Sequence, residues 1–465
     1  MRIAAISVTP LFPDYVHGGS QKILADVATG LKTNGHDVEI WCPHLDGNVD
    51  DFEIGNVIVH RTLKLRGTFP ATHQVSPADL IETTQALRKA AEWANRVYLH
   101  ADAIYLRQAL EGKQIVRSIH DYMYEEALLS TLTLPADITI VPSEYLKDCI
   151  EATVALSGRK TIEPIIVIPN GVHVPETLPQ PQLPDDILPR EENDLILLYP
   201  HRPEPTKGVC EALQTAAMIQ NLDRSRNVRL LMPSSAWDKD MDESTISANE
   251  IRQTAEVYGA SDIVETHEWL SAAEMPGYYA AGDVTLCVGS FVEAFGLVPV
   301  ESIANGTPAV CASVGALRQF SAISGISLVT HGDIPATANA VLSAVANSDS
   351  TDLTESERFW IATGYSEAKM VSKFEDVMTH TIPEKREIKV APGNQLKLAP
   401  WCYVEGEAIF DDYIAGWSDY PELVAALKAG YGLVPADPLL LSASLDAEVR
   451  YARRYGILIP DFIFE

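Results

Sequence analysis

Short apolar runs alternate with amphipathic segments along most of this 465-residue chain, and this alternation constrains the fold more than any other feature. An apolar run at 2–8 is followed by a helical pattern at 20–35 and by a second apolar run at 37–43. Continuous apolar strands that alternate with helices predict a parallel sheet covered by helices on both faces. The sequence therefore predicts an α/β fold built from doubly wound sheets.

The alternation stops once and then starts again, which predicts two such sheets. A proline-rich and acidic stretch at 176–194 lacks periodicity and is expected to be a linker. We therefore expect one Rossmann-like domain at 1–175, a second at 195–365 and a closing helix at 366–380. Two doubly wound domains in series bind a ligand between them, at the carboxyl ends of their strands.

Residues 381–465 extend beyond these two domains and are rich in aromatic side chains between 401 and 432. The helical stretches at 420–430 and 445–456 are too short to be stable alone. We expect them to form a mainly helical subdomain that packs on the rest of the chain, or on the same segment of a second copy in a homo-oligomer. The alternative is that exposed rings stack on a sugar or on an acceptor.

Charge and cysteine pattern narrow the functional classes. With 35 Lys and Arg against 64 Asp and Glu, the net charge of −29 disfavours nucleic acid and anionic lipid as partners. Six scattered cysteines without a C-x-x-C pair indicate reduced thiols and a cytoplasmic protein. The start does not read as a signal peptide, and no apolar run reaches the roughly 18 residues of a membrane span. An acidic run at 238–243 lacks the glycine of a calcium loop, and we expect a solvated loop and no metal site.

Two glutamates, Glu293 and Glu301, flank Gly296 at an expected strand-to-helix turn. The amides of Phe295, Gly296 and Leu297 are expected to be donors at the start of the helix, where phosphate groups bind. Carboxylates accept hydrogen bonds well from vicinal hydroxyls, so this pattern fits a nucleotide-sugar with its diphosphate between ribose and hexose. The alternative is a solvated helix start with an acid near its positive end.

Other candidate residues stand at the same expected edge. Arg202 and Lys207 follow a strand and precede a helix, where two cations neutralise a diphosphate, although ordinary loop solvation is an alternative. His120 ends a strand of the first domain and either donates to a sugar hydroxyl or has a structural role. Gly18 and Gly19 precede a helix and allow the backbone to approach a ligand closely.

In chain order, these motifs resemble the retaining glycosyltransferases of family 4. The matching motifs are Gly-Gly at 18–19, His-Asp at 120–121, Pro-Asn-Gly-Val at 169–172, Arg…Lys-Gly at 202–208 and Glu-x7-Glu at 293–301. The resemblance covers about residues 1–380 and implies a GT-B fold, in which two Rossmann-like domains face a cleft. It implies transfer of a hexose from a UDP- or GDP-sugar to an acceptor hydroxyl with retention, with neither a metal nor a further cofactor.

The resemblance also implies a role for each site residue. Arg202 and Lys207 bind the donor diphosphate, Glu293 contacts the donor sugar, Glu301 contacts the ribose, and His120 lies near the reacting carbon. In that family the leaving phosphate itself deprotonates the acceptor on the same face. No carboxylate nucleophile is then needed.

The chain departs from the family pattern at two places, so neither the sugar nor the acceptor is specified. His173 stands where the family often has an aspartate. Ala316, Arg318 and Gln319 stand where the family often has a small-residue pair followed by an acid. Asp121 is expected to cap the helix that follows it.

Two other functional classes stay open at this point. One is a different GT-B activity, such as a sugar-nucleotide epimerase or a phosphorylase. The other is a non-catalytic GT-B protein that binds a partner through the C-terminal extension, although a chain without activity has no need to retain all five polar site residues.

Overall fold

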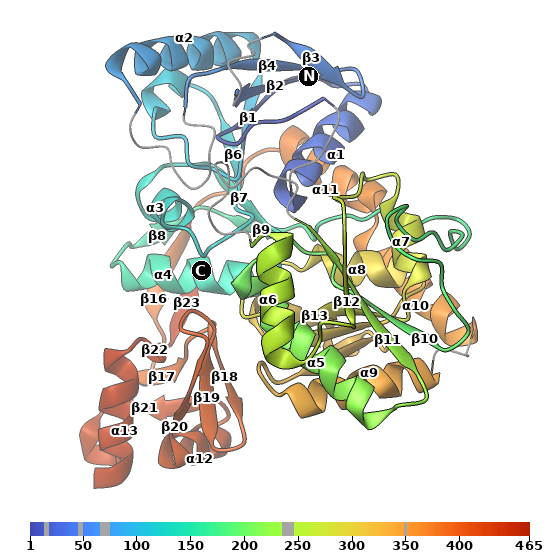
Figure 1. Cartoon of the computed structure of the whole chain (residues 1–465). Helices are drawn as coiled ribbons and strands as arrows, with labels where there is room; N and C mark the ends of the chain where they lie inside the picture. Colours follow the sequence, from blue (N-terminus) through green and yellow to red (C-terminus); the bar gives the residue numbers. More distant parts are fainter. Residues whose placement is uncertain (14–17, 45–49, 66–74, 235–245, 348–350) are drawn as a thin grey trace.

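The computed structural model describes residues 1–13, 18–44, 50–65, 75–234, 246–347 and 351–465 (Figure 1). The structure contains two parallel sheets, each covered by helices, and the C-terminal extension lies below the first domain and beside the second in this view. The predicted doubly wound architecture is confirmed.

The first sheet has eight strands in the order β3-β4-β2-β1-β5-β6-β7-β9, and all neighbours are parallel except β3 and β4. The strands are β1 (Arg2–Ser7), β2 (Asp37–Pro43), β3 (Phe52–Ile54), β4 (Val57–Leu63), β5 (Arg96–His100), β6 (Ile115–Ser118), β7 (Ile138–Val141) and β9 (Ile165–Val167). The helices are α1 (Gly19–Thr33), α2 (Pro77–Trp93), η1 (Arg107–Leu110), α3 (Glu125–Thr133) and α4 (Glu144–Leu156). Helix α1 packs on one face and α2 on the other, so the central strands are buried on both sides.

The second sheet has six parallel strands in the order β12-β11-β10-β13-β14-β15. The strands are β10 (Asp194–Leu198), β11 (Asn227–Pro233), β12 (Val264–His267), β13 (Val284–Cys287), β14 (Ala309–Ala312) and β15 (Ile326–Val329). The helices are η2 (Pro205–Lys207), α5 (Val209–Leu222), α6 (Ala248–Tyr258), α7 (Met275–Ala281), α8 (Leu297–Ala304), η3 (Gly315–Ala322), α9 (Ile334–Asn347) and α10 (Thr351–Tyr365). Helices α5, α6 and α9 cover one face, whereas α7 and α8 cover the other.

After the second sheet the chain returns to the first one. Helix α11 (Glu367–Thr379) packs against α1, and its Met370 and Phe374 join the apolar core of the first sheet (Figure 1). The approach is close, because a Cβ atom on Gly30 would lie 2.5 Å from a methyl carbon of Val371. The closing helix therefore ties the end of the second sheet to the first.

The C-terminal extension has more residues in short antiparallel strands than in helices, so the expectation of a mainly helical subdomain is wrong. Its strands are β16 (Arg386–Val390), β17 (Gln395–Leu398), β18 (Cys402–Glu405), β19 (Ala408–Asp411), β20 (Gly416–Asp419), β21 (Leu433–Pro435), β22 (Leu458–Pro460) and β23 (Phe462–Phe464). The expected helices are α12 (Pro421–Ala429) and α13 (Ala443–Arg454), and η4 (Pro438–Leu440) precedes the second. Strand β16 pairs with β8 (Thr161–Ile162), which attaches the extension to the first domain. No helix in the described part of the chain is long and apolar enough to cross a membrane.

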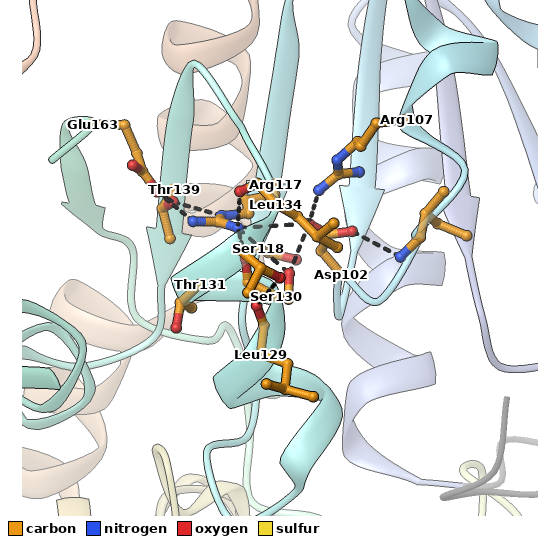
Figure 2. A network of polar contacts seen from close by, with 12 residues as sticks. Asp102, Arg107, Arg117, Ser118, Leu129, Ser130, Thr131, Leu134, Thr139 and Glu163 are labelled. Atoms are coloured by element: carbon orange, nitrogen blue, oxygen red, sulfur yellow. Dashed lines mark hydrogen bonds and ion pairs between the residues drawn. The ribbon is translucent and has the colours of Figure 1, made fainter. Parts of the chain in front are cut away.

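A buried polar network fixes strand β6 (Figure 2). The Arg117 side chain is fully buried, and its Nη1 donates to the carbonyl oxygen of Ser130 at 2.8 Å. Its Nε donates to Thr139 Oγ1 at 2.8 Å, and its Nη2 is paired with Glu163. Asp102 accepts a hydrogen bond from Ser130 Oγ at 3.0 Å. The network joins β6 and β7 to α3, and β6 leads directly into the His120 segment.

Candidate active site

The turn between β13 and α8 presents backbone amides rather than side chains. Gly296 is the N-cap of α8, and its φ of 92° lies in the left-handed region that favours glycine. A Cβ atom there would also lie 2.4 Å from Leu317 Cδ2. The Phe295 side chain is buried and packs edge-on against Phe320, with ring centroids 5.7 Å apart. The helix begins at Leu297 without a side-chain cap among the described residues, which leaves its first amides to an anion.

Lys207 and Glu293, which are far apart in the sequence, form an ion pair beside this turn. Lys207 Nζ donates to Glu293 Oε1 at 2.6 Å and lies 3.4 Å from the centroid of the Phe291 ring. The Phe291 amide donates to the carbonyl oxygen of Thr206 at 2.8 Å, so the lysine loop and the glutamate loop are joined through their backbones. Two of the predicted site residues are therefore in direct contact.

The surroundings of Glu293 keep it ionised. Burial alone raises the pKa of Glu293, but the charge and hydrogen bond of Lys207 and, less strongly, the charge of Arg202 lower it below its ordinary value. Burial, followed by the charge of Lys207, lowers the pKa of His201 to about 4, so this imidazole is neutral near pH 7. His201 Nε2 is 3.1 Å from the carbonyl oxygen of Leu286, which fixes the ring behind the pair. Sequence reasoning missed His201, although it stands next to Arg202.

The second glutamate has different partners. Glu301 lies in α8 and accepts a hydrogen bond from the Tyr279 hydroxyl at 3.2 Å. Burial raises the pKa of Glu301, and the charge of Lys22 in α1 opposes that rise. Lys22 Nζ itself bonds to Asp26 at 2.7 Å and to Glu367 at 3.1 Å. Glu301 therefore faces the first domain, whereas Glu293 faces the lysine loop.

The two glycines before α1 differ in what they require. Gly18 is the N-cap of α1 with an extended backbone, which any residue can adopt. Gly19 has no room for a side chain, because a Cβ atom would lie 2.7 Å from Leu297 Cδ1 of the second domain. The close approach at Gly19 is therefore one between α1 and α8. It places the glycine pair beside the turn that precedes α8.

His120 lies just after β6 on the first domain. Its Nε2 is 2.9 Å from Ser118 Oγ, and its ring centroid is 4.4 Å from that of His100. The chain of contacts continues from His100 to Ser20 Oγ at 2.9 Å and to the Tyr98 hydroxyl at 2.8 Å. Burial lowers the pKa of His120 to about 4, so the ring is neutral near pH 7. Among the described residues, nothing hydrogen-bonds to its buried Nδ1.

Asp121 is a site residue whose position sequence reasoning misjudged. Helix α3 begins only at Glu125, so Asp121 does not cap it; its Oδ1 instead accepts a hydrogen bond from the Met123 amide at 2.9 Å. Burial raises the pKa of Asp121 to about 7; the Met123 bond and the charge of Lys207 oppose that rise, whereas the charge of Glu293 adds to it. Asp121 therefore faces the lysine–glutamate pair from the other domain. Its place beside His120 at a strand end was the available signal.

The residues that depart from the family pattern support the Glu293 segment. The Ala316 amide donates to the carbonyl oxygen of Glu293 at 2.9 Å, and Gln319 Nε2 donates to that of Phe295 at 3.1 Å. Arg318 forms an ion pair with an acid of the C-terminal extension. These three residues therefore contact backbone and extension rather than each other.

The other departure from the family pattern is His173. His173 is exposed near the bridge between Val172 and Ser366, where the chain passes from one sheet to the other. The run at 238–243 lies outside the described residues. Elsewhere, in the ranges that the structure describes, no group of three or more His, Cys, Asp or Glu residues is arranged to hold a metal ion.

Comparisons with known proteins show the family to which the two domains belong. Residues 17–175 match the description "Glycosyltransferase Family 4", and residues 184–357 match "Glycosyl transferases group 1". The lipopolysaccharide 1,2-N-acetylglucosaminetransferase of Salmonella typhimurium is 24% identical over 51% of this chain and 61% of its own. The D-inositol 3-phosphate glycosyltransferase of Streptosporangium roseum is 33% identical over 29% of this chain and 31% of its own. The chain thus spans less than two thirds of the length of these curated relatives.

Solved structures show the same fold. The sucrose-phosphate synthase of Thermosynechococcus elongatus has a TM-score of 0.63 at 20% identity, over 81% of this chain and 98% of its own. Anabaena HepE in complex with UDP and glucose has a TM-score of 0.62 at 16% identity, over 81% of this chain and 99% of its own. This likeness shows the GT-B fold, and the two family matches, which together span most of the chain, show that it belongs to the glycosyltransferases, with a family 4 domain followed by a group 1 domain.

Proposed function

We propose that this chain transfers a hexose from a nucleotide-diphosphate sugar to an acceptor hydroxyl, with retention and without a metal. The observation that carries the proposal is the Lys207–Glu293 pair beside the uncapped start of α8. It combines a cation for phosphate and a carboxylate for sugar hydroxyls with a helix start that favours anions.

Each residue of the second domain then has a definite task. Arg202 and Lys207 neutralise the charge that develops on the leaving diphosphate, in the place that a metal ion takes in other transferases. The first amides of α8 hold phosphate oxygens. Ionised Glu293 accepts hydrogen bonds from hexose hydroxyls, and Glu301 accepts them from the ribose.

The first domain supplies an uncharged side chain, His120, near the reacting carbon. Neutral His120 directs its unused Nδ1 to the sugar near the reacting carbon. The bond between the anomeric carbon and the phosphate oxygen breaks as the acceptor oxygen bonds to the same face of that carbon. The acceptor proton passes to the leaving phosphate oxygen, so no protein nucleophile is consumed.

We propose UDP-hexoses as the donors to test first. Anabaena HepE, which shares the fold, is described in complex with UDP and glucose, and the Salmonella relative is named for N-acetylglucosamine transfer. Support for this choice comes from those proteins, and GDP-sugars are the comparison set.

Calorimetry with a panel of UDP- and GDP-sugars tests donor binding, since a ligand that binds the folded state stabilises it by mass action. Proton NMR of the sugar released by donor hydrolysis then tests the stereochemistry, and the α-anomer should appear first from an α-linked donor. Glu301→Gln tests the ribose contact and should weaken binding of every nucleotide-sugar, because all of them contain the ribose. First appearance of the β-anomer, conversion of the donor to an epimer, or no binding of any donor would contradict the proposal.

A further inference from the structure

The C-terminal extension places one carboxylate at the junction between the two Rossmann-like domains. Asp412 follows β19, and its side chain has no exposed surface. Its Oδ1 accepts hydrogen bonds from the Gly315 amide at 3.1 Å and from Arg318 Nη1 at 2.8 Å. Its Oδ2 accepts from Arg318 Nη2 at 2.8 Å and from the Tyr145 hydroxyl at 2.9 Å. Donors from both domains therefore converge on a carboxylate that belongs to neither.

The partners of Asp412 lie in two elements, η3 of the second domain and α4 of the first. Arg318 in η3 meets the carboxylate through both Nη atoms, which is the strongest geometry for such a pair. Its guanidinium also lies 5.3 Å from the ring centroid of Tyr145 in α4 and 4.8 Å from that of Tyr403 in β18. Loss of the Asp412 charge would leave Arg318 uncompensated in a largely buried place.

The same two elements hold the backbone that carries Glu293. In η3, Ala316 donates to the Glu293 carbonyl oxygen at 2.9 Å, and Gln319 donates to that of Phe295 at 3.1 Å. In α4, the N-cap hydroxyl of Ser143 donates at 2.6 Å to the carbonyl oxygen of the residue between them. Three consecutive carbonyl groups are thus held by η3 and α4, and Asp412 joins η3 to α4.

We propose that Asp412 is a positioning residue for Glu293. By fixing η3 against α4, it sets the backbone of Glu293 relative to the donor sugar. The contacts are independent of any assigned activity, whereas the kinetic consequence rests on the proposed function. HepE aligns over 99% of its own chain, so its fold is complete without a counterpart to 19% of this chain. That share corresponds in size to residues 381–465.

The proposal also accounts for Arg318. The resemblance to family 4 places small residues and then an acid in this loop, and an arginine there needs a partner. The extension supplies the partner, so Arg318 and Asp412 act as one unit. In this chain, the segment that follows the two domains supports the site between them.

Kinetics of the full-length Asp412→Asn variant test the proposal, with UDP-hexose hydrolysis as the reaction. We expect kcat to fall by about 10- to 100-fold, since displacements of about 1 Å remote from the reacting atoms reduce rates to this extent. The donor KM should change by less than about threefold, because Glu301, the proposed ribose ligand, is bonded to Tyr279 in α7 and not to η3 among the described interactions. The double variant Asp412→Asn/Glu293→Gln should be no slower than Glu293→Gln alone, because both changes act through one carboxylate. Losses that multiply in the double variant would overturn the proposal.

Glu405→Gln is the matched control. Glu405 also joins the extension to the second domain, through a hydrogen bond from Thr330 Oγ1 at 2.5 Å, but it is exposed, and no contact among the described residues links it to the Glu293 segment. It should leave kcat unchanged. Tyr145→Phe removes one hydroxyl and keeps the ion pair, so it should lower kcat in the same sense by less than Asp412→Asn. This milder variant decides the question if Asp412→Asn does not fold.

Hydrogen exchange measures positioning without any substrate. Amides of peptides that cover 292–297 and 312–319 should exchange at least about tenfold faster in Asp412→Asn than in the native chain, and at the native rate in Glu405→Gln. A chain that turns over no nucleotide-sugar would refute the proposed function, while faster exchange would still support the positioning role. Unchanged exchange in both peptides would refute the positioning role whatever the activity.

Discussion

Replacement of Lys207 by alanine should reverse the direction in which folding shifts the pKa of Glu293. Their charged atoms lie 2.6 Å apart, and their side chains are only 13% and 25% exposed. A hydrogen bond to a charged group contributes about 1.5–3 kcal/mol. Loss of Lys207 removes this bond together with the positive charge, so it should raise the pKa of Glu293. Burial would then hold this pKa above its ordinary value rather than below it.

The sign of the stability change follows from linkage. In the native chain the pKa of Glu293 is lower when folded than when unfolded, so the ion pair stabilises the protein at neutral pH, and this stability is lost as pH falls through the folded pKa. In Lys207→Ala the folded pKa is the higher one, so the buried carboxylate destabilises the protein at neutral pH, and protonation relieves that penalty as pH falls. The difference in unfolding free energy between the two proteins should therefore narrow from pH 7.5 to pH 5, by no more than the roughly 1.5–3 kcal/mol that a hydrogen bond to a charged group contributes.

Urea unfolding followed by tryptophan fluorescence at several pH values measures this difference. Lys207 also packs over the Phe291 ring, so part of the loss should be independent of pH. The double variant Lys207→Ala/Glu293→Gln removes the titrating group and isolates that part. If the difference in unfolding free energy between the native chain and Lys207→Ala stays constant or widens toward pH 5, Lys207 does not set the ionisation of Glu293.

Four further predictions follow from the same contacts. Glu293→Gln should mainly lower kcat, because Glu293 contacts the sugar as its bond breaks, and Glu301→Gln should mainly raise the donor KM, because Glu301 holds the ribose throughout. Steady-state kinetics in which the two effects are exchanged would reverse the assignment. Arg202→Ala should lower kcat by about 10²–10³-fold. A chelator should leave the native rate unchanged, and a loss of activity in the chelator that magnesium restores would refute the metal-free mechanism. Because burial lowers the pKa of His120 to about 4, the pH profile of kcat/KM should show no limb from this residue between pH 5 and 8, and a limb there that vanishes in His120→Asn would contradict a neutral ring. Arg117→Met should lower the unfolding free energy by about 3–5 kcal/mol, because it breaks the buried ion pair with Glu163, and a loss below about 1 kcal/mol in chemical denaturation would refute that account.

Sequence alone predicted those features that depend on neighbouring residues. The periodicity of apolar positions identified the parallel sheets, because hydrophobic runs that alternate with helices can be buried in few other ways. Gly296 before a helix start predicted the turn at α8, since its backbone conformation is a local property. The expected helices at 420–430 and 445–456 formed as well. The short strands of the extension were missed, because runs of three to five residues carry too little alternation to be distinguished from loops.

Only the tertiary structure decided which of these local features meet. Lys207 and Glu293 pair across 86 positions of the chain, and the return of α11 to the first sheet is a contact that its own amphipathic pattern did not specify. Asp121 was read as a helix cap because its burial against the opposite domain is invisible in the residues around it. Asp412 looked like one surface acid among 64 acidic residues, and folding placed it among donors from both domains. Periodicity reports how a segment buries its own surface, whereas a site built from distant loops depends on how the two sheets and the extension pack together.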